Sequence, residues 1–557
     1  MRMNQRVRQN MTWVAPLLAL AIVAVGPVTT AAAPAESPLV EAARSGDLER
    51  VRALLGLSAA VDAQAVDGMT ALHWAVQRDA AEMTALLLAA GADVATTNRY
   101  GVTPLTLAST NGNVATVDRL LAAGADANTR LAGGETVLMT AARTGNVEVI
   151  DALLAGGADP NATEEARGQT AVMWAAGENN AAAIAALVAG GADVLARTSD
   201  LAANDTRGTF SRAVGLTEPV RSGPSFTALL FAVQLGQADA VRALLDAGAD
   251  INDTFPNGTS ALVVAAMNGQ WELAVFLIDQ GADVHAAEQG WNALHQTIRL
   301  RRTNIGHMPP PAGQGTLSSL DLINRLIAAG VDVHVPMTAD FRDGYRNRLN
   351  RLGATPFLLA SKNVDTAVMR ILLEAGADPL VANADLTTPL MVAAGVDMWN
   401  PGEDGGATVE DEPEALAAVT MLVELGNDVL AVNDRGETAL HGAAYRGAPS
   451  IVDYLVEQGA QIDARSDQGW TPWTIANGVF YSLFYKEQPQ TADVLAALMA
   501  DRGISTDGMA DALRTCFDCG RNRGTLRDDD GKRVAQPTPD QVPGQDTPTE
   551  QQAAPPQ

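Results

Sequence analysis

The sequence predicts an all-α fold, a solenoid of about twelve stacked helix-turn-helix units, and three observations predict it. Aromatic residues make up only 4% of the 557 residues, which is too few for several large globular cores. A threonine recurs every 33 or 34 residues, at Thr70, Thr103, Thr136 and Thr170. A Gly-Ala-Asp turn recurs with the same step. A period of this length indicates a repeat architecture rather than separate domains.

The first helix of each unit is predicted directly after the recurring threonine. Examples are DGMTALHWA (67–75), YGVTPLTLA (100–108) and RGETALHGA (435–443). The threonine is the expected N-cap, because its hydroxyl can accept a backbone N–H, and the preceding glycine allows a tight turn. Small residues such as Ala75 and Ala108 let neighbouring helices approach closely.

The second helix is leucine-rich and precedes the Gly-Ala-Asp turn, as in ALLLAAGAD (85–93), RALLDAGAD (242–250) and RILLEAGAD (370–378). Leucine pairs such as Leu372 and Leu373 lie at the spacing that faces a shared core. The glycine after this helix is the expected left-handed C-cap. One unit cannot bury its apolar face alone, so the units are expected to be stabilised by stacking.

These motifs resemble the ankyrin repeat, whose signature is T-P-L-H-x-A at a period of 33 residues. The resemblance covers about residues 39–504, and the arrangement with long inserts is similar to that of exported bacterial ankyrin-repeat proteins. It implies a non-catalytic scaffold that binds a protein partner. The expected binding surface is a concave face, formed by the finger tips and the exposed end of each first helix.

Residues 1–35 are predicted to be a signal peptide outside the solenoid, which is assigned to 36–504. Arg2, Arg6 and Arg8 precede an apolar run that is too short to span a bilayer comfortably, and small residues follow. The chain is therefore expected to be exported, periplasmic or extracellular, without stable membrane insertion after cleavage. An uncleaved anchor is the alternative. The C-terminal extension, 505–557, is rich in Asp, Pro, Gln and Thr and is expected to be largely disordered.

Five inserts interrupt the period, at 201–224, 303–317, 337–352, 398–413 and 479–490. Solenoids tolerate insertions at loops, so these segments are interpreted either as neutral drift or as loops that extend a binding face.

The formal net charge of −27 argues against nucleic-acid binding. Residues 299–351 depart from it, with eight arginines against four aspartates. The sequence therefore allows an anion-binding patch, predicted at Arg301, Arg302, Arg342, Arg346, Arg348 and Arg351. This patch supports an alternative function, an envelope structural protein that binds an acidic polymer. The other interpretation is that these arginines pair with neighbouring acids.

No pattern in the sequence indicates an enzyme, a metal site or a cofactor. His73, His295 and His441 occupy the histidine slot of the repeat motif, His285 and His334 follow the Gly-x-Asp turn, and His307 lies in an insert. No phosphate-binding loop or clustered histidines are present in the sequence. Cys516 and Cys519 are interpreted as a possible local disulfide, with a redox role as the alternative.

The family resemblance places variable side chains at the finger tip and at the end of the first helix. Aromatic and arginine side chains, which often dominate interface energies, concentrate there in the second half of the chain. The predicted partner-binding residues are Trp291, Arg299, Lys362, Tyr445, Arg446 and Trp470. The alternative is that the two tryptophans cover loops. Trp74 and Trp174 are expected to pack inside the fold, and the chain is expected to be a monomer.

Overall fold

The computed structural model describes residues 37–199, 226–302, 315–340, 348–398, 411–480 and 485–507. These ranges exclude the predicted signal peptide, nearly all of the C-terminal extension with Cys516 and Cys519, the whole insert at 201–224 and part of each of the other four inserts. The chain divides into two units, 1–99 and 100–557, and each is described by itself.

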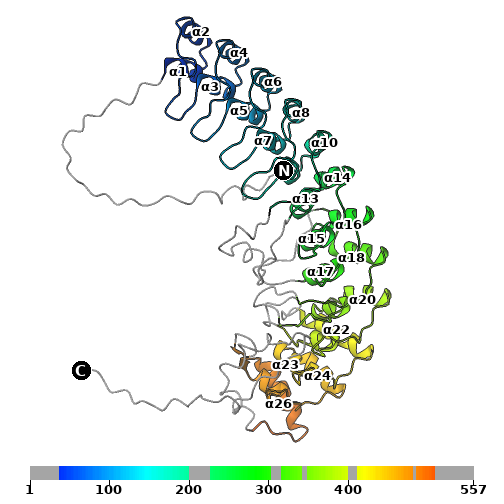
Figure 1. Ribbon diagram of the computed structural model, residues 1–557. Coiled ribbons are helices and arrows are strands. Elements are labelled where there is room, and N and C mark those ends of the chain that lie inside the picture. Colours follow the sequence, from blue (N-terminus) through cyan, green and yellow to red (C-terminus); the bar gives the residue numbers. More distant parts are fainter. Residues whose placement is uncertain are drawn as a thin grey trace, which may run out of the picture. The chain divides into compact units, whose positions relative to one another are not determined.

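The first unit contains two antiparallel helix pairs (Figure 1). Its helices are α1 (Pro38–Ser45), α2 (Leu48–Gly56), α3 (Ala71–Gln77) and α4 (Ala81–Ala89). Helix α1 packs against α3, and each first helix packs against the second helix that follows it.

The second unit continues the same alternation of first and second helices (Figure 1). The first helices are α5 (Pro104–Asn111), α7 (Val137–Thr144), α9 (Ala171–Gly177), α13 (Ala228–Leu235), α15 (Ala261–Met267), α17 (Ala293–Arg301), α19 (Pro356–Lys362), α21 (Pro389–Ala394), α23 (Ala439–Arg446) and α25 (Pro472–Ala476). The second helices are α6 (Val114–Ala122), α8 (Val147–Ala155), α10 (Ala181–Ala189), α14 (Ala238–Asp246), α16 (Trp271–Asp279), α18 (Ser319–Ala328), α20 (Thr366–Glu374), α22 (Glu412–Glu424), α24 (Pro449–Glu457) and α26 (Pro489–Ala500).

The first helices begin where the sequence predicts, with a hydroxyl or amide side chain at the N-cap. Thr355, for example, accepts the backbone N–H of Leu358 at 3.2 Å and caps α19. The glycine after each second helix from α4 to α24 is left-handed as expected, with φ of 95° at Gly124 and 92° at Gly376. These confirmed caps explain why the boundaries follow the 33-residue period.

The first helices of the second unit pack on one another in succession from α5 to α25. The stack is continuous across the position of the insert at 201–224, because the described residues on either side of it meet. The N–H of Thr198 donates to the carbonyl of Phe226 at 2.9 Å, and the N–H of Phe226 donates to Thr198 Oγ1 at 3.1 Å. Helix α9 therefore packs directly against α13.

The core is built from small and aliphatic side chains, as the composition predicts. Leu105, Ala108, Leu120 and Leu372 are all buried. The all-α repeat fold is confirmed, with one small exception in the last insert. There β1 (Val479–Phe480) and β2 (Tyr485–Lys486) form a short antiparallel ladder that the sequence did not predict.

Leu386 occupies a finger-tip position that other fingers fill with glycine, such as Gly101 and Gly436, and it has a φ of 60°. Its side chain is 60% exposed, so burial compensates little for the strained backbone. We expect Leu386→Gly to raise the free energy of unfolding by about 1 kcal/mol. Urea unfolding followed by circular dichroism measures this change, and an unchanged or lower midpoint would contradict it.

Candidate interaction surfaces

The residue four positions after each N-cap is called here the first-helix row, because it recurs on the same face of every first helix. Its members in the second unit are Leu107, Thr140, Trp174, Phe231, Val264, Gln296, Leu359, Val392, Gly442 and Ile475. Leu107, Trp174 and Phe231 are partly exposed, whereas every member from Val264 onward is buried. Within the described part of the second unit, the row is therefore open to solvent at α5, α9 and α13, whereas Thr140 of α7 is buried.

An arginine stacks on the tryptophan in the open part of the row. The guanidinium carbon of Arg143, at the end of α7, lies 5.3 Å from the ring centre of Trp174. The first unit repeats this arrangement with Arg44 and Trp74 at 5.9 Å. Cation–π pairs of this kind hold an aromatic ring in one orientation. Trp74 and Trp174 are thus only partly buried, although the sequence predicted packing residues.

Three of the predicted partner-binding side chains are partly exposed. They are Trp291, in the finger before α17, Arg299, near the end of α17, and Lys362, at the end of α19. The Nε of Arg299 donates to Gln296 Oε1 at 3.4 Å, so this side chain lies along its own helix.

The other three predicted partner-binding side chains are inside the fold. Tyr445 is 1% exposed and Arg446 is 6% exposed, and Trp470 is also buried. Arg446 donates to the carbonyls of Ala393 and Ala394, at 3.1 and 3.3 Å, which are the last two residues of α21. The expectation that these three side chains offer contact area to a partner is therefore not met.

Two arginines of the predicted anion patch already have partners within the chain. Arg301 Nε binds Asp365 Oδ2, and Arg302 Nη2 binds Glu414 Oε2 at 2.7 Å. Both carboxylates lie at the beginning of second helices, α20 and α22. These pairs agree with the interpretation that the arginines neutralise neighbouring acids.

The remaining members of the patch do not assemble a described cationic surface. Arg351 is buried and Arg348 is partly buried. Arg342 and Arg346 lie outside the described residues, so their part in the acidic-polymer alternative stays a prediction.

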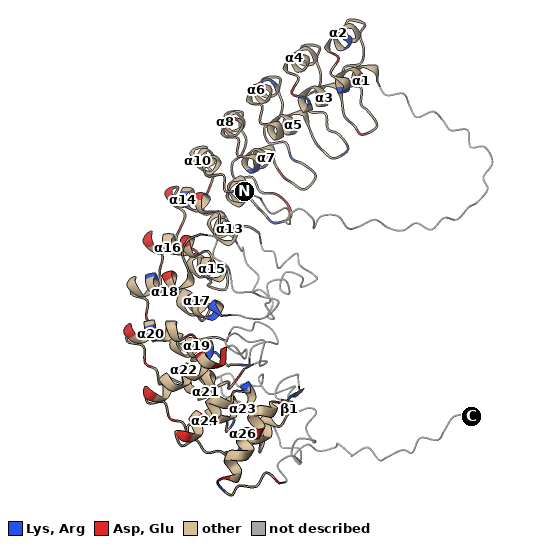
Figure 2. Cartoon of the chain, turned by 180° about the vertical axis from the view of Figure 1, so that it is seen from behind, with Lys and Arg blue, Asp and Glu red and all other residues tan. Residues whose placement is uncertain are grey.

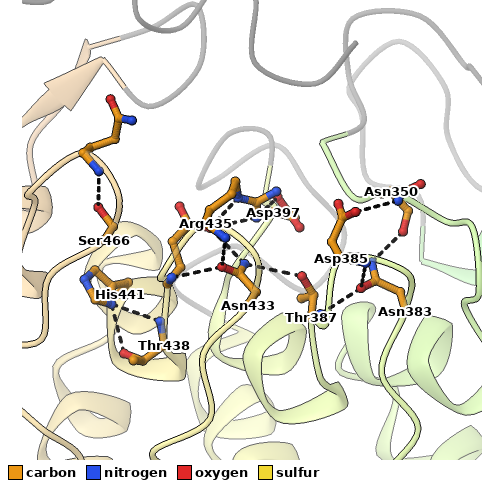
Figure 3. A network of polar contacts seen from close by, with 12 residues as sticks. Asn350, Asn383, Asp385, Thr387, Asp397, Asn433, Arg435, Thr438, His441 and Ser466 are labelled. Atoms are coloured by element: carbon orange, nitrogen blue, oxygen red, sulfur yellow. Dashed lines mark hydrogen bonds and ion pairs between the residues drawn. The ribbon is translucent and has the colours of Figure 1, made fainter. Parts of the chain in front are cut away.

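A chain of buried polar contacts joins the fingers of three consecutive repeats (Figure 3). Each finger begins with an asparagine whose amide oxygen accepts backbone N–H groups. Asn383 accepts from Thr387 at 2.8 Å, and Asn433 accepts from Glu437 at 3.0 Å. The amide of Asn350 then donates to Asp385 at 2.8 Å. These bonds satisfy groups that burial would otherwise leave unpaired.

A buried ionic group completes this finger network (Figure 3). Arg435 Nη2 lies 2.6 Å from Asp397 Oδ1, and Arg435 Nε lies 2.8 Å from Glu437 Oε2. Burial raises the pKa of Asp397, and the Arg435 guanidinium opposes that rise. This ionic group was not predicted from the sequence. Its only local signal was an arginine and a glutamate flanking the finger-tip glycine, RGE at 435–437.

The histidines in the histidine slot of the repeat motif have a structural role, because each one bonds to its own helix cap and His295 and His441 also bond to a neighbouring turn. His441 Nδ1 lies 2.9 Å from the Thr438 hydroxyl, and its Nε2 lies 3.0 Å from the carbonyl of Trp470. His295 makes the equivalent contact to the carbonyl of Val335 at 3.0 Å. Because Nδ1 also faces the backbone N–H of the cap residue, the neutral ring fits both neighbours.

Burial lowers the pKa of His295 to about 4 and also lowers the pKa of His441. The unfolded chain, with an ordinary histidine pKa of about 6.5, then binds more protons than the folded chain. We therefore expect the contribution of His295 to be complete above that unfolded value and to be lost as the pH falls toward the folded one. The loss amounts to about 3 kcal/mol.

Denaturant unfolding at a series of pH values tests this expectation on the wild type and on His295→Leu. Leucine stands at the same slot in α13 and α19, as Leu230 and Leu358. The variant is expected to be less stable at neutral pH but to show a shallower dependence on pH. Equal slopes for the two proteins would contradict the assignment.

The described residues carry no sign of a metal site or a membrane span. Among them, no three His, Cys, Asp or Glu side chains gather in a way that could hold a metal ion. Likewise, none of the helices in the described ranges has the length and apolar character that crossing a bilayer requires.

Family comparisons match most of the repeats. A family model described as ankyrin repeats (3 copies) matches residues 39–131, 107–198 and 229–307. A second, ankyrin repeats (many copies), matches 422–476. Together the matched ranges cover more than half of the chain.

Similar curated proteins include the human ankyrin repeat and SOCS box protein 16, which is 32% identical over 39% of this chain and 47% of its own length. A transient receptor potential cation channel subfamily A member 1 homolog from Caenorhabditis elegans is 32% identical over 23% of this chain and 9% of its own. The putative ankyrin repeat protein YahD of Escherichia coli is 27% identical over 29% of this chain and 87% of its own.

The chain thus spans less than half the length of the first two relatives. What it shares with all three is the repeat itself, and ankyrin repeats generally mediate protein–protein interaction. The family models, the 33-residue period and the stacked helix pairs agree. The chain belongs to the ankyrin-repeat family.

Proposed function

We propose that this protein is an exported, non-catalytic ankyrin scaffold that binds a protein partner through the first-helix and finger side of its repeats. The observation that carries the proposal is the Arg143–Trp174 pair in the open part of the first-helix row. A tryptophan oriented by an arginine at a partly exposed site has the side chains that usually contribute most to interface energy. Trp291, Arg299 and Lys362 extend the proposed surface toward α17 and α19.

Export is the part of the proposal that rests on the N-terminal sequence alone. Its test is fractionation of cells that express the native chain, followed by N-terminal analysis of the mature protein. Recovery outside the cytoplasm with residues 1–35 removed is the expected result. An intact N-terminus in the cytoplasmic fraction would contradict export without affecting the binding surface.

Site-directed photocrosslinking tests the binding surface, with p-benzoylphenylalanine placed at Trp174 or Trp291 in the full chain. The same partner is expected at both positions and is then purified for affinity measurements. Trp174→Ala and Trp291→Ala are each expected to weaken binding at least about tenfold.

Leu57→Ala is the matched control, because Leu57 is an exposed apolar residue directly after α2 and outside the first-helix row. It is expected to leave the affinity unchanged. Equal affinities for the wild type and both tryptophan variants would reject the proposed surface. A partner crosslinked as strongly from position 57 would reject it as well.

A further inference from the structure

A polar ladder runs along the turns that follow the second helices. The ladder position is the second residue after the Asp of each Gly-x-Asp turn, and it reaches the next repeat. Asn128 Oδ1 accepts the N–H of Asp159, and Asn161 Oδ1 accepts the N–H of Asp193, both at 2.8 Å. Asn252 makes the same contact to Asp283 at 2.8 Å. At these positions the side chain stabilises the stack of repeats.

Two consecutive repeats place an exposed leucine at the ladder position instead. Leu380 is 50% exposed and Leu430 is 55% exposed, and neither can form the ladder hydrogen bond. Val381 and Val432 beside them are exposed as well. Asn427 takes over part of the missing ladder, since its amide donates to the carbonyl of Pro379 at 3.2 Å. The leucines therefore contribute little to stacking, and these two neighbouring turns each expose a leucine and a valine to solvent.

Acidic residues precede both leucines in the chain, at the end of the second helix and in the turn that follows it. Helices α20 and α22 end in Glu374 and Glu424, whereas α6, α8 and α10 end in alanine. Asp378 and Asp428 lie in the turns that follow. Figure 2 shows such acidic ends in red beside α14, α16 and α20. A carboxylate in the last turn of a helix opposes the helix dipole, so these residues do not help the helix.

No described basic side chain neutralises this acidic rim. All four carboxylates are exposed, and none of them forms an ion pair within the described ranges. Arg370, one turn before Glu374 on α20, is also exposed and makes no ion pair with it there. The surface combines an apolar centre with a negative border.

We propose that Leu380, Val381, Leu430 and Val432, named here the Leu380–Leu430 patch, dock a basic amphipathic segment of a protein partner. The apolar centre would bury leucine-like side chains, and the rim of Glu374, Asp378, Glu424 and Asp428 selects lysines and arginines on either side of them. An acidic segment would be repelled by the same rim. This surface is separate from the first-helix row and does not depend on the function proposed above.

The test uses the full chain and a fluorescent amphipathic peptide made of leucine and lysine. Anisotropy is expected to report binding that weakens as salt rises, because the rim acts through charge. A peptide of equal length with glutamate in place of lysine is expected not to bind. Failure of the lysine peptide to bind, or equal binding of the glutamate peptide, would overturn the proposal.

The substitutions for the patch variants are residues that other repeats of this chain carry at the same positions. Leu380→Asn/Leu430→Asn installs the residue used at the ladder position elsewhere, and Asp-Pro-Asn at 159–161 shows that asparagine fits the Asp-Pro context of Leu380. The double variant is expected to fold and to bind the lysine peptide at least about tenfold more weakly. Unchanged affinity in a folded double variant would overturn the proposal.

Two further variants distinguish peptide binding at the Leu380–Leu430 patch from nonspecific binding to any exposed leucine. Leu195 is 54% exposed at the same ladder position, but its repeat has Ala189 where Glu374 and Glu424 stand and keeps only the turn acid, Asp193. Leu195→Asn is therefore expected to leave binding unchanged, and a loss equal to that of the double variant would contradict the site.

Glu374→Ala/Glu424→Ala, which installs the alanine of α6 and α8, is expected to weaken binding and reduce its salt dependence. If the chain bound anionic vesicles through the same leucines, a membrane would replace the protein partner and the proposal would fail.

Discussion

Replacing Gly442 by alanine is expected to lower the free energy of unfolding by about 3 kcal/mol, although alanine normally favours a helix interior. Gly442 lies in α23, where a Cβ atom would stand 2.5 Å from the backbone nitrogen of Val396 and 2.9 Å from the carbonyl carbon of Gly395. Both atoms belong to the backbone directly after α21, so a rotamer change cannot relieve the clash.

Gly177→Ala is the matched control for this substitution. Gly177 is the last residue of α9, and its added Cβ would meet only Leu235 Cδ1 at 3.8 Å, an ordinary contact. The control is expected to be neutral or to stabilise by up to about 1 kcal/mol. Urea unfolding of both variants decides the matter. If Gly442→Ala proved as stable as Gly177→Ala, the close crossing of α23 and the chain after α21 would not exist in solution.

The same crossing positions the buried ionic group of the fingers. An added Cβ on Gly395 would approach the carbonyl oxygen of Gly442 to 2.6 Å, so the two glycines allow one backbone to lie directly on the other. Asp397 follows two residues later, with a left-handed φ of 63°, and reaches Arg435. The glycine in the fifth position of the TALHGA motif thus has a consequence outside its own helix.

The sequence predicted those features that repeat locally. The cap at Thr355, the left-handed Gly376 and the buried Leu372 each follow from residues within one turn of the position concerned. Because every unit repeats the same short-range pattern, the 33-residue period of the cap and turn motifs was enough to predict the positions of most helices. The repeat stack needed no long-range information beyond the expectation that apolar faces stack.

The side chains that the sequence misplaced depend on contacts across repeats. Arg446 was expected at the surface because its slot is exposed in the family, but α21 ends at Ala394 and leaves carbonyls that Arg446 binds. The partners of Arg301 and Arg302 are 64 and 112 residues away in the sequence. A count of charges within residues 299–351 does not include these acidic partners. The count therefore overstates the net positive charge around the two arginines.

Asp365 joins these long-range contacts, and Asp365→Ala is expected to cost about 3 kcal/mol of unfolding free energy. Its Oδ1 accepts the N–H of Val368 at 3.3 Å and caps α20, while its Oδ2 binds Arg301. The carboxylate is buried, and Arg301 is largely shielded from water, so removing one partner leaves a poorly solvated charge behind.

Two comparisons separate the cap from the ion pair. Asp47 caps α2 from an exposed position without an ion pair in the described residues, and Asp47→Ala is expected to cost only about 1 kcal/mol. Asp365→Asn keeps an oxygen that can accept the N–H of Val368. It is expected to lower the free energy of unfolding by about 2 kcal/mol, which is the part of the effect that comes from losing the charge beside Arg301. A double-mutant cycle with Arg301→Met then measures the pair directly. A coupling energy near zero would assign the whole effect of Asp365 to the cap, and Arg301 would again be available to an anionic ligand.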